Sequence, residues 1–298
     1  MVRPLDEYDH LSQMTGGASI DWRLVLTVNC FLPSPPLSAY VETFCFSEGE
    51  VALHTKESRL PDGRMALVIN LGHEVLRVSH REHADQFQSF HGGVLSGAHS
   101  QFSVLDTTTL VTTIYVCFKP GGVCPFLPMP AAELTNQVVD LSTLWGTAAF
   151  DLREQLQIAQ TPENRVRILE CFLLARAAWG QTRHPAVSFA LAEFLTGQKR
   201  RSISEVTTHL GLSPKRFIHL FEEAVGLTPK MFCRVLRFQE VLRLIENGQS
   251  VSWTDLALSC GYFDQAHFIH DFQTFAGLTP STYLTQRSQH RNHVPLPS

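Results

Sequence analysis

Side chains that can neutralise phosphate or donate hydrogen bonds gather in the C-terminal part of the chain. Lysine and arginine carry a positive charge, glutamine can pair with the edge of adenine, and histidine can donate to guanine or phosphate. Such residues lie in a basic run and in two later groups. The candidate phosphate contacts are Lys199, Arg200 and Arg201, and the candidate DNA contacts are Ser213, Lys215, Arg216, Ile218, His219, Gln265, Ala266, His267, Ile269 and His270.

One helical sequence pattern occurs twice between Ile203 and Tyr283. The first copy reads FIHLFEEAVGLTP from Phe217, and the second reads FIHDFQTFAGLTP from Phe268. Eight of these thirteen positions are identical at an offset of 51 residues. Because apolar residues recur at helical spacing in both copies, each copy predicts a helix with one buried face.

Each copy has the order helix, tight turn and second helix. The turns are Gly211-Leu212-Ser213 and Cys260-Gly261-Tyr262, and Ser213 and Asp264 are suited to cap the second helix of their copy. The phenylalanine stripe of the second helix must point inward, so the candidate contact residues point outward. A major groove about 12 Å wide admits such a helix, whose N-terminal half reaches the base edges.

The segment from Pro229 to about Asn247 is predicted to be one helix between the two copies. Thr228 is suited to cap it, Pro229 stands at its first position, and Gly248 follows its end. Its eighteen or so residues give a length of roughly 27 Å. Since one turn of B-DNA is about 34 Å long, this connector could hold the two second helices in successive major grooves.

These features resemble the AraC/XylS-type bacterial transcription regulators. The resemblance covers about residues 185–287 and rests on the duplicated unit, the connector, the motif GYFDQAHF from Gly261, and the later Gly277, Thr279-Pro280 and Tyr283. It implies a double helix-turn-helix DNA-binding domain at residues 184–288, followed by a tail at 289–298. At His219 and His270 the family often carries arginine, so imidazoles would make those contacts here.

The residues before this domain predict a β-rich unit. Residues 1–36 are poorly patterned and are predicted to be an N-terminal arm, and residues 37–183 a sensing or dimerisation domain that ends in helices. Predicted strands lie at 39–46, 65–71, 75–79, 87–90, 102–105 and 110–118, and predicted helices at 141–156 and 163–178. Turn motifs at 60–63 and 118–122 resemble an N-terminal domain type of the same family. The predicted fold class is α+β multidomain: a small β-barrel or cupin-like domain with helices, then an all-α domain of two helix-turn-helix units joined by a long helix.

Charged residues, cysteines and apolar runs indicate where DNA could bind, whether disulfides form and whether the chain enters a membrane. Residues 1–184 hold 13 basic and 19 acidic side chains, and residues 185–298 hold 11 and 9, so the C-terminal part is the basic one. The seven cysteines are scattered and form no CxxC pair, which predicts free thiols rather than a disulfide framework or zinc site. No run of eighteen apolar residues and no signal-peptide pattern is found, so we expect a cytoplasmic protein without a membrane partner.

Two classes of function remain. The first is a sequence-specific transcription regulator that binds double-stranded DNA and is controlled by its N-terminal domain, through an unknown small-molecule effector or as a homodimer, with RNA polymerase as a further candidate partner. The alternative is a cupin-like metal-dependent enzyme with an appended helical domain. Its candidate ligands His80, His83, His91 and His99 lack HxH or HExxH spacing, and Phe118-Lys119-Pro120-Gly121-Gly122 lacks the pattern of a phosphate-binding loop. We therefore expect no catalytic residue, metal or cofactor.

Overall fold

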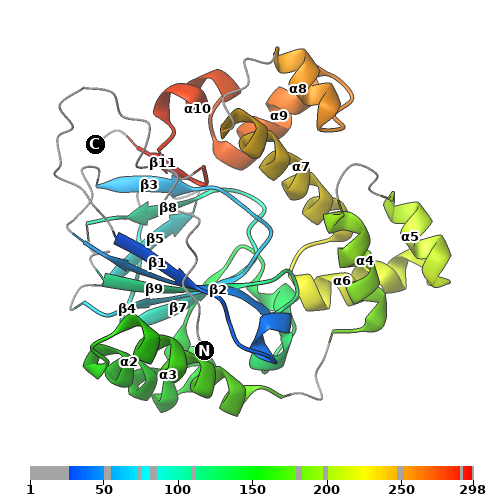
Figure 1. The fold of residues 1–298 in the computed structure, drawn as a ribbon. Helices are drawn as coiled ribbons and strands as arrows, with labels where there is room; N and C mark the ends of the chain where they lie inside the picture. The colour runs from blue at the N-terminus through cyan, green and yellow to red at the C-terminus, as the bar shows by residue number, and fades with distance from the viewer. Residues whose placement is uncertain are drawn as a thin grey trace.

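Two antiparallel β-sheets form the N-terminal part of the molecule (Figure 1). The computed structural model describes residues 27–49, 55–72, 75–80, 86–108, 112–178, 183–196, 201–246, 252–288 and 291–296. One sheet has the strand order β1-β2-β9-β4-β7-β10, formed by β1 (Thr27–Phe31), β2 (Val41–Glu48), β9 (Thr112–Phe118), β4 (Ala66–Asn70), β7 (Gly93–Ser96) and β10 (Val138–Asp140). The second has the order β11-β3-β8-β5-β6, formed by β11 (His293–Pro295), β3 (Lys56–Arg59), β8 (Ser103–Asp106), β5 (Leu76–His80) and β6 (Gln88–Phe90).

The six strands predicted from sequence are present, with ends within two residues of the prediction. Strands β3, β7 and β10 were not predicted. They have three or four residues each, and β3 reads KESR, which shows no apolar alternation. Such strands are specified by pairing with their neighbours rather than by their own composition.

Strands β1 and β11 lie where the sequence predicts an arm and a tail. Strand β1 pairs with β2 at the edge of the first sheet, and β11 pairs with β3 at the edge of the second. Val294 of β11 is fully buried. The end of the chain therefore returns to the β-rich part after the last helix, which no local pattern in residues 289–298 indicates.

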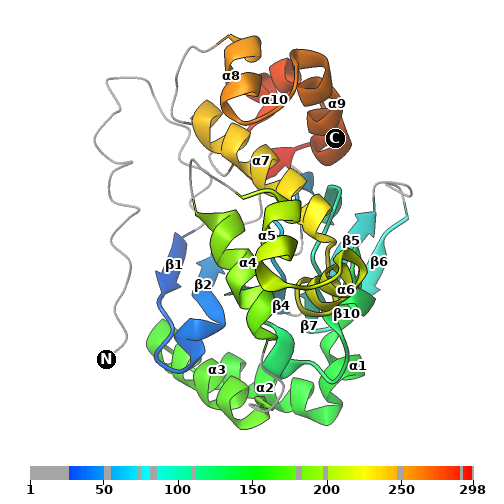
Figure 2. The same ribbon diagram turned by 90° about the vertical axis from the view of Figure 1, so that its right-hand side faces the viewer.

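The helices follow the predicted order (Figures 1 and 2). A break at Gly146, whose φ is +59°, divides the predicted helix at 141–156 into two. The first group of helices is α1 (Leu141–Trp145), α2 (Thr147–Ile158) and α3 (Pro162–Arg176), and the second is α4 (Pro185–Leu195), α5 (Ile203–Leu210), α6 (Pro214–Val225), α7 (Pro229–Glu246), α8 (Trp253–Ser259), α9 (Gln265–Ala276) and α10 (Pro280–Gln286). The expectation of a β-rich domain with helices and a helical C-terminal domain is confirmed.

The helical domain packs directly on the β-rich domain. Helix α6 ends against the short 3-10 helix η5 (Ala131–Leu134), where the Thr135 hydroxyl donates to the Gly226 carbonyl. The Gln239 side chain on α7 donates to the Pro61 carbonyl at 2.7 Å. Buried side chains of both domains belong to one continuous apolar cluster.

Cys30 and Cys45 form a disulfide between β1 and β2. The two residues stand opposite each other in the strand register. The expectation of free thiols is therefore wrong for this pair, because only strand pairing brings together two cysteines without a recognisable sequence spacing. The remaining five cysteines form no disulfide.

Two glycines that end helices of the first helix-turn-helix unit test the domain packing. Both Gly211 and Gly226 have positive φ, +63° and +82°. A Cβ at Gly211 would meet nothing within 4 Å, whereas at Gly226 it would lie 2.6 Å from the Met65 side chain and 3.1 Å from the Ala131 carbonyl oxygen. We predict that Gly211→Ala lowers the free energy of unfolding by about 1 kcal/mol, the cost of left-handed backbone alone.

Gly226→Ala adds overpacking against the β-rich domain, and the loss should be at least about 2 kcal/mol. Urea unfolding of the full chain, followed by circular dichroism, measures both values. Equal losses for the two variants would contradict the close domain contact at Gly226.

Candidate nucleic-acid interface

The first helix-turn-helix unit consists of α5 and α6. Ser202 and Glu205 form a capping box at the start of α5, and the hydrogen bonds from Ser202 lower the pKa of the Glu205 carboxyl. Gly211 takes the left-handed conformation in the turn, and the Ser213 hydroxyl accepts from the Arg216 amide at 3.3 Å to cap α6. Phe217 and Phe221 of α6 are fully buried, which fixes the direction of its opposite face.

The predicted contact residues of α6 lie on that opposite face. Ser213, Lys215, Arg216, Ile218 and His219 are all exposed, although the His219 Nε2 atom lies 3.4 Å from the Glu223 carboxylate one turn further along. The cap, the two basic residues and the imidazole thus form one accessible group at the N-terminal half of the helix.

The second unit, α8 and α9, repeats this geometry. The Asp264 carboxylate accepts from the His267 amide at 2.7 Å and caps α9. Gln265, Ala266, His267 and His270 are exposed, whereas Ile269 is half-buried. Phe263, in the turn before α9, is 86% exposed, and sequence reasoning had assigned it no role.

The Gln265 side chain forms a hydrogen bond within the protein. Its Oε1 atom accepts a hydrogen bond from the Thr254 hydroxyl of α8 at 3.0 Å. The Nε2 group faces no such constraint and can donate. In this arrangement Gln265 offers a donor to a base acceptor, and two-point pairing with adenine requires the Thr254 contact to open.

A buried ion pair beneath α9 was missed by sequence reasoning. Asp271 is 2% exposed, and its Oδ1 atom accepts from the Arg234 guanidinium of α7 at 2.6 Å, with a second contact at 3.3 Å. The His267 Nε2 atom lies 4.0 Å from the same carboxylate, and its ring packs edge-on against Tyr262. The sequence contains a signal for this pair. Asp271 stands at a position of the apolar stripe where the first copy has Leu220, and Arg234 lies on the predicted connector helix.

The predicted phosphate contacts divide into two sets. Arg201 lies 3.2 Å from the Glu193 carboxylate of α4, and its guanidinium sits over the Phe189 ring at 5.9 Å, so this side chain is held against α4. Lys199 and Arg200 lie outside the described residues. Arg201 therefore lies next to the first unit, but its side chain packs on α4 and does not extend away from the protein.

Helix α7 separates the two units, which pack at opposite ends of it (Figure 1). Thr228 caps the helix through the Met231 amide at 3.0 Å, as the sequence predicts. Near the second unit, the Arg237 guanidinium donates to the Gly261 carbonyl and stacks on Tyr262 at 5.2 Å. The turn of the second unit is thereby fastened to the connector.

Comparisons with known proteins agree with this geometry. Residues 206–286 match a helix-turn-helix domain family, and residues 29–140 match a domain of unknown function, DUF6597. An uncharacterised HTH-type transcriptional regulator of Haemophilus influenzae is 33% identical over 72 residues, 24% of each chain. The melibiose operon regulatory protein of Escherichia coli is 26% identical over 94 residues, 32% of this chain and 31% of its own.

Two solved structures illustrate the similarity of fold. An apo ToxT variant from Vibrio cholerae aligns over 81% of this chain and 97% of its own, with 13% identity and a TM-score of 0.43. A transcriptional regulator from Chromobacterium violaceum with an AraC-type DNA-binding domain aligns over 35% of this chain and 89% of its own, with 25% identity and a TM-score of 0.30.

The family match and the repeated motif identify residues 206–286 as a helix-turn-helix domain of the AraC type. The chain spans about a quarter to a third of the length of the two curated regulators it matches. Within the described ranges, no three His, Cys, Asp or Glu side chains are grouped as metal ligands, and no helix is long and apolar enough to cross a membrane.

The Arg234–Asp271 pair generates a stability prediction. Arg234→Met leaves a buried carboxylate without its cation and should lower the free energy of unfolding by about 3 kcal/mol. Adding Asp271→Leu, which restores the residue type of the first copy, should recover most of that loss. Urea unfolding of the full chain measures each variant.

Arg243→Met is the matched control, because Arg243 pairs with Glu240 on the surface of the same helix. Its removal should change stability by less than about 1 kcal/mol. If Arg234→Met has as small an effect as this control, the buried pair does not hold α9 on α7.

Proposed function

We propose that this protein is a sequence-specific transcription regulator whose two helix-turn-helix units read successive major grooves of double-stranded DNA. The observation that carries the proposal is the pair of exposed N-terminal faces on α6 and α9. Each face stands opposite a fully buried phenylalanine stripe, so its direction is set by the core. At each face, the capped N-terminus of the helix lies next to side-chain donors that can bind phosphate or base edges.

Residues of the two faces have different roles in this proposal. Lys215 and Arg216, at the start of α6, neutralise phosphate, as do Lys199 and Arg200 of the preceding run. Gln265 and the two histidines donate to bases or phosphate, while Ile218, Ala266 and Ile269 offer apolar contact to thymine methyl groups. Ser213 caps the start of α6, and His267 lies beside the Asp271 carboxylate that binds Arg234 of α7.

The β-rich domain is the controlling part of the regulator. We divide the chain near residues 183–184, with β11 returning to the first domain. Control through this domain is supported by its direct contacts with the first unit at Gly226 and with the connector at Gln239. A change in the β-rich domain can therefore alter the placement of both units, in response to a small-molecule effector or to dimerisation.

The first test is selection of genomic DNA fragments by the full chain, followed by titration of the enriched sequences. The full chain should form a sequence-specific complex with the selected duplex. A plot of log affinity against log salt concentration should have a slope of about −0.9 per phosphate neutralised. If no sequence is enriched at low salt, the proposed function is wrong.

Substitutions in the two faces should separate base contact from phosphate contact. Gln265→Ala should cost about 1 to 3 kcal/mol on the selected site and relax preference at one or two adjacent base pairs. Lys215→Ala should weaken all duplexes to a similar degree and reduce the salt slope by about one. Gln273→Ala, an exposed change in the C-terminal half of α9, is the control and should leave affinity unchanged.

The histidines of the two faces predict a pH dependence. A protonated imidazole donates from two nitrogens and attracts phosphate. Affinity should therefore rise as pH falls from about 8 to 6. The same titration with the His219→Gln, His270→Gln double variant should give a flatter curve, and parallel curves would show that the histidines carry no charge contact.

A further inference from the structure

The turn of the second helix-turn-helix unit exposes an aromatic side chain. Phe263 is 86% exposed, the highest fraction for any large apolar side chain in the part of the chain that the structure describes. It stands directly before Asp264, the residue that caps α9. From Phe263 to His267 every residue is exposed, so the ring continues the accessible N-terminal face of α9 into the turn.

Phe263 is an insertion relative to the first unit. Leu212 of the first turn and Tyr262 of the second each follow a glycine with positive φ, and each donates its amide to a carbonyl of the preceding helix, at 3.3 and 2.9 Å. These two residues are therefore equivalent, and they stand 50 residues apart. The caps that follow, Ser213 and Asp264, stand 51 residues apart. The extra residue of the second turn is Phe263.

The inner place of the turn is already filled by Tyr262. Its ring is buried and meets the Phe268 ring of α9 at 5.5 Å, and the Arg237 guanidinium of α7 lies over it at 5.2 Å. Because one aromatic ring occupies this position between α7 and α9, the added ring lies on the outer side of the turn. The exposure of Phe263 is thus a consequence of the packing beneath it.

Hydrogen bonds hold the backbone on both sides of Phe263. Before it, the Gly261 carbonyl accepts from the Arg237 guanidinium at 3.1 Å. After it, the Asp264 carboxylate accepts from the His267 amide at 2.7 Å. A ring presented from a fixed backbone loses less conformational freedom on contact than one on a mobile loop, which favours binding.

The chemistry of the partner follows from the place of the turn. In the proposed function the N-terminus of α9 enters the major groove, so a side chain next to the cap meets base edges there. Among the groups that base pairs present in this groove, the C5 methyl group of thymine is the apolar one, and a phenylalanine ring can pack on it. Burial of apolar surface on both partners stabilises such a contact, whereas phosphate offers the ring no comparable gain.

We propose that Phe263 packs on the C5 methyl group of a thymine that lies within about two base pairs of the contact made by Gln265. The inserted ring makes the turn, and not helix α9 alone, a determinant of sequence preference. It gives the half-site of the second unit a thymine preference that the shorter turn of the first unit does not supply. This inference rests on the proposed DNA-binding function, so its test distinguishes failure of the contact from failure of that function.

The test uses the full chain and the duplex most enriched by selection from genomic fragments. Each thymine in the half-site that responds to Gln265→Ala is replaced in turn by deoxyuridine, which removes the methyl group and keeps every hydrogen-bonding group. One replacement should weaken binding about three- to fivefold. Phe263→Ala should weaken binding of the unmodified duplex by at least the same factor, and the same deoxyuridine should cause no further loss with this variant.

Phe150→Ala is the matched control, because Phe150 of α2 is also an exposed phenylalanine but lies in the β-rich domain. It should bind both duplexes like the unchanged protein. Phe263→Ala should leave the melting temperature of the full chain unchanged, since the ring is exposed. A clear fall in melting temperature would mean that Phe263 serves the fold instead.

Three results would overturn the inference. They are undiminished binding by Phe263→Ala, equal deoxyuridine responses of the variant and the unchanged protein at every thymine, and a selected half-site without a thymine near the Gln265 contact. In each case the unchanged protein still binds its duplex, so the proposed function stands. If the unchanged protein binds no duplex at all, the proposed function is wrong and the Phe263 contact is wrong with it.

Discussion

Aromatic packing against α7 is the interaction on which the helical domain depends. Phe232, near the start of α7, meets Phe221 of α6 at 5.6 Å, and Phe238, further along, meets Phe272 and Phe275 of α9 at 5.2 and 5.1 Å. Large buried rings contribute more apolar area than any other side chains and prefer defined angles. One helix therefore sets the direction of both exposed faces, and a change in its packing would move them together.

The same helix is also the surface on which the two domains meet. The backbone at Gly63 approaches the Phe232 ring so closely that a Cβ there would lie 3.1 Å from it. Gln239 reaches both the Pro61 carbonyl and the Asn292 side chain, which joins the β-rich domain, the connector and the C-terminal segment at one point. The arrangement makes the placement of the helical domain sensitive to the shape of the β-rich domain.

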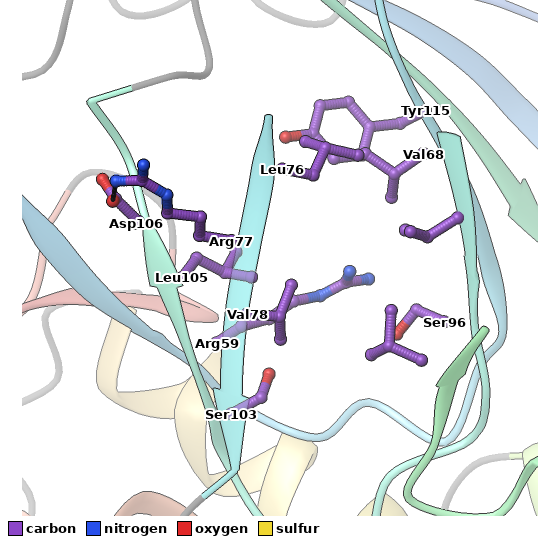
Figure 3. A pocket seen from close by; sticks show the side chains of 12 residues that line it. Arg59, Val68, Leu76, Arg77, Val78, Ser96, Ser103, Leu105, Asp106 and Tyr115 are labelled. Carbon is purple, nitrogen blue, oxygen red and sulfur yellow. Dashed lines mark hydrogen bonds and ion pairs between the residues drawn. The ribbon is translucent and has the colours of Figure 1, made fainter. Parts of the chain in front are cut away.

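Charged groups are used differently in the two domains. Beneath α9, the Asp271 carboxylate is nearly hidden from water and is paired with the partly exposed Arg234 of α7, so the pair holds one helix on the other. In the β-rich domain, the Arg59 side chain (Figure 3) is only half-buried and has no ion pair among the described residues. A buried pair contributes structural specificity, whereas a half-exposed guanidinium stays hydrated at its charged end.

The sequence by itself determined the elements whose signals are local. Helical periodicity, the caps at Ser213, Thr228 and Asp264, and the repeat predicted the C-terminal helices and their exposed faces, while alternation predicted six strands. Tertiary structure decided what depends on partners distant in the chain: the short strands β3 and β11, the Cys30–Cys45 disulfide and the Arg234–Asp271 pair. A strand of three or four residues, or one charged side chain, has no periodicity of its own, because its free energy comes from the neighbour that it meets only after folding.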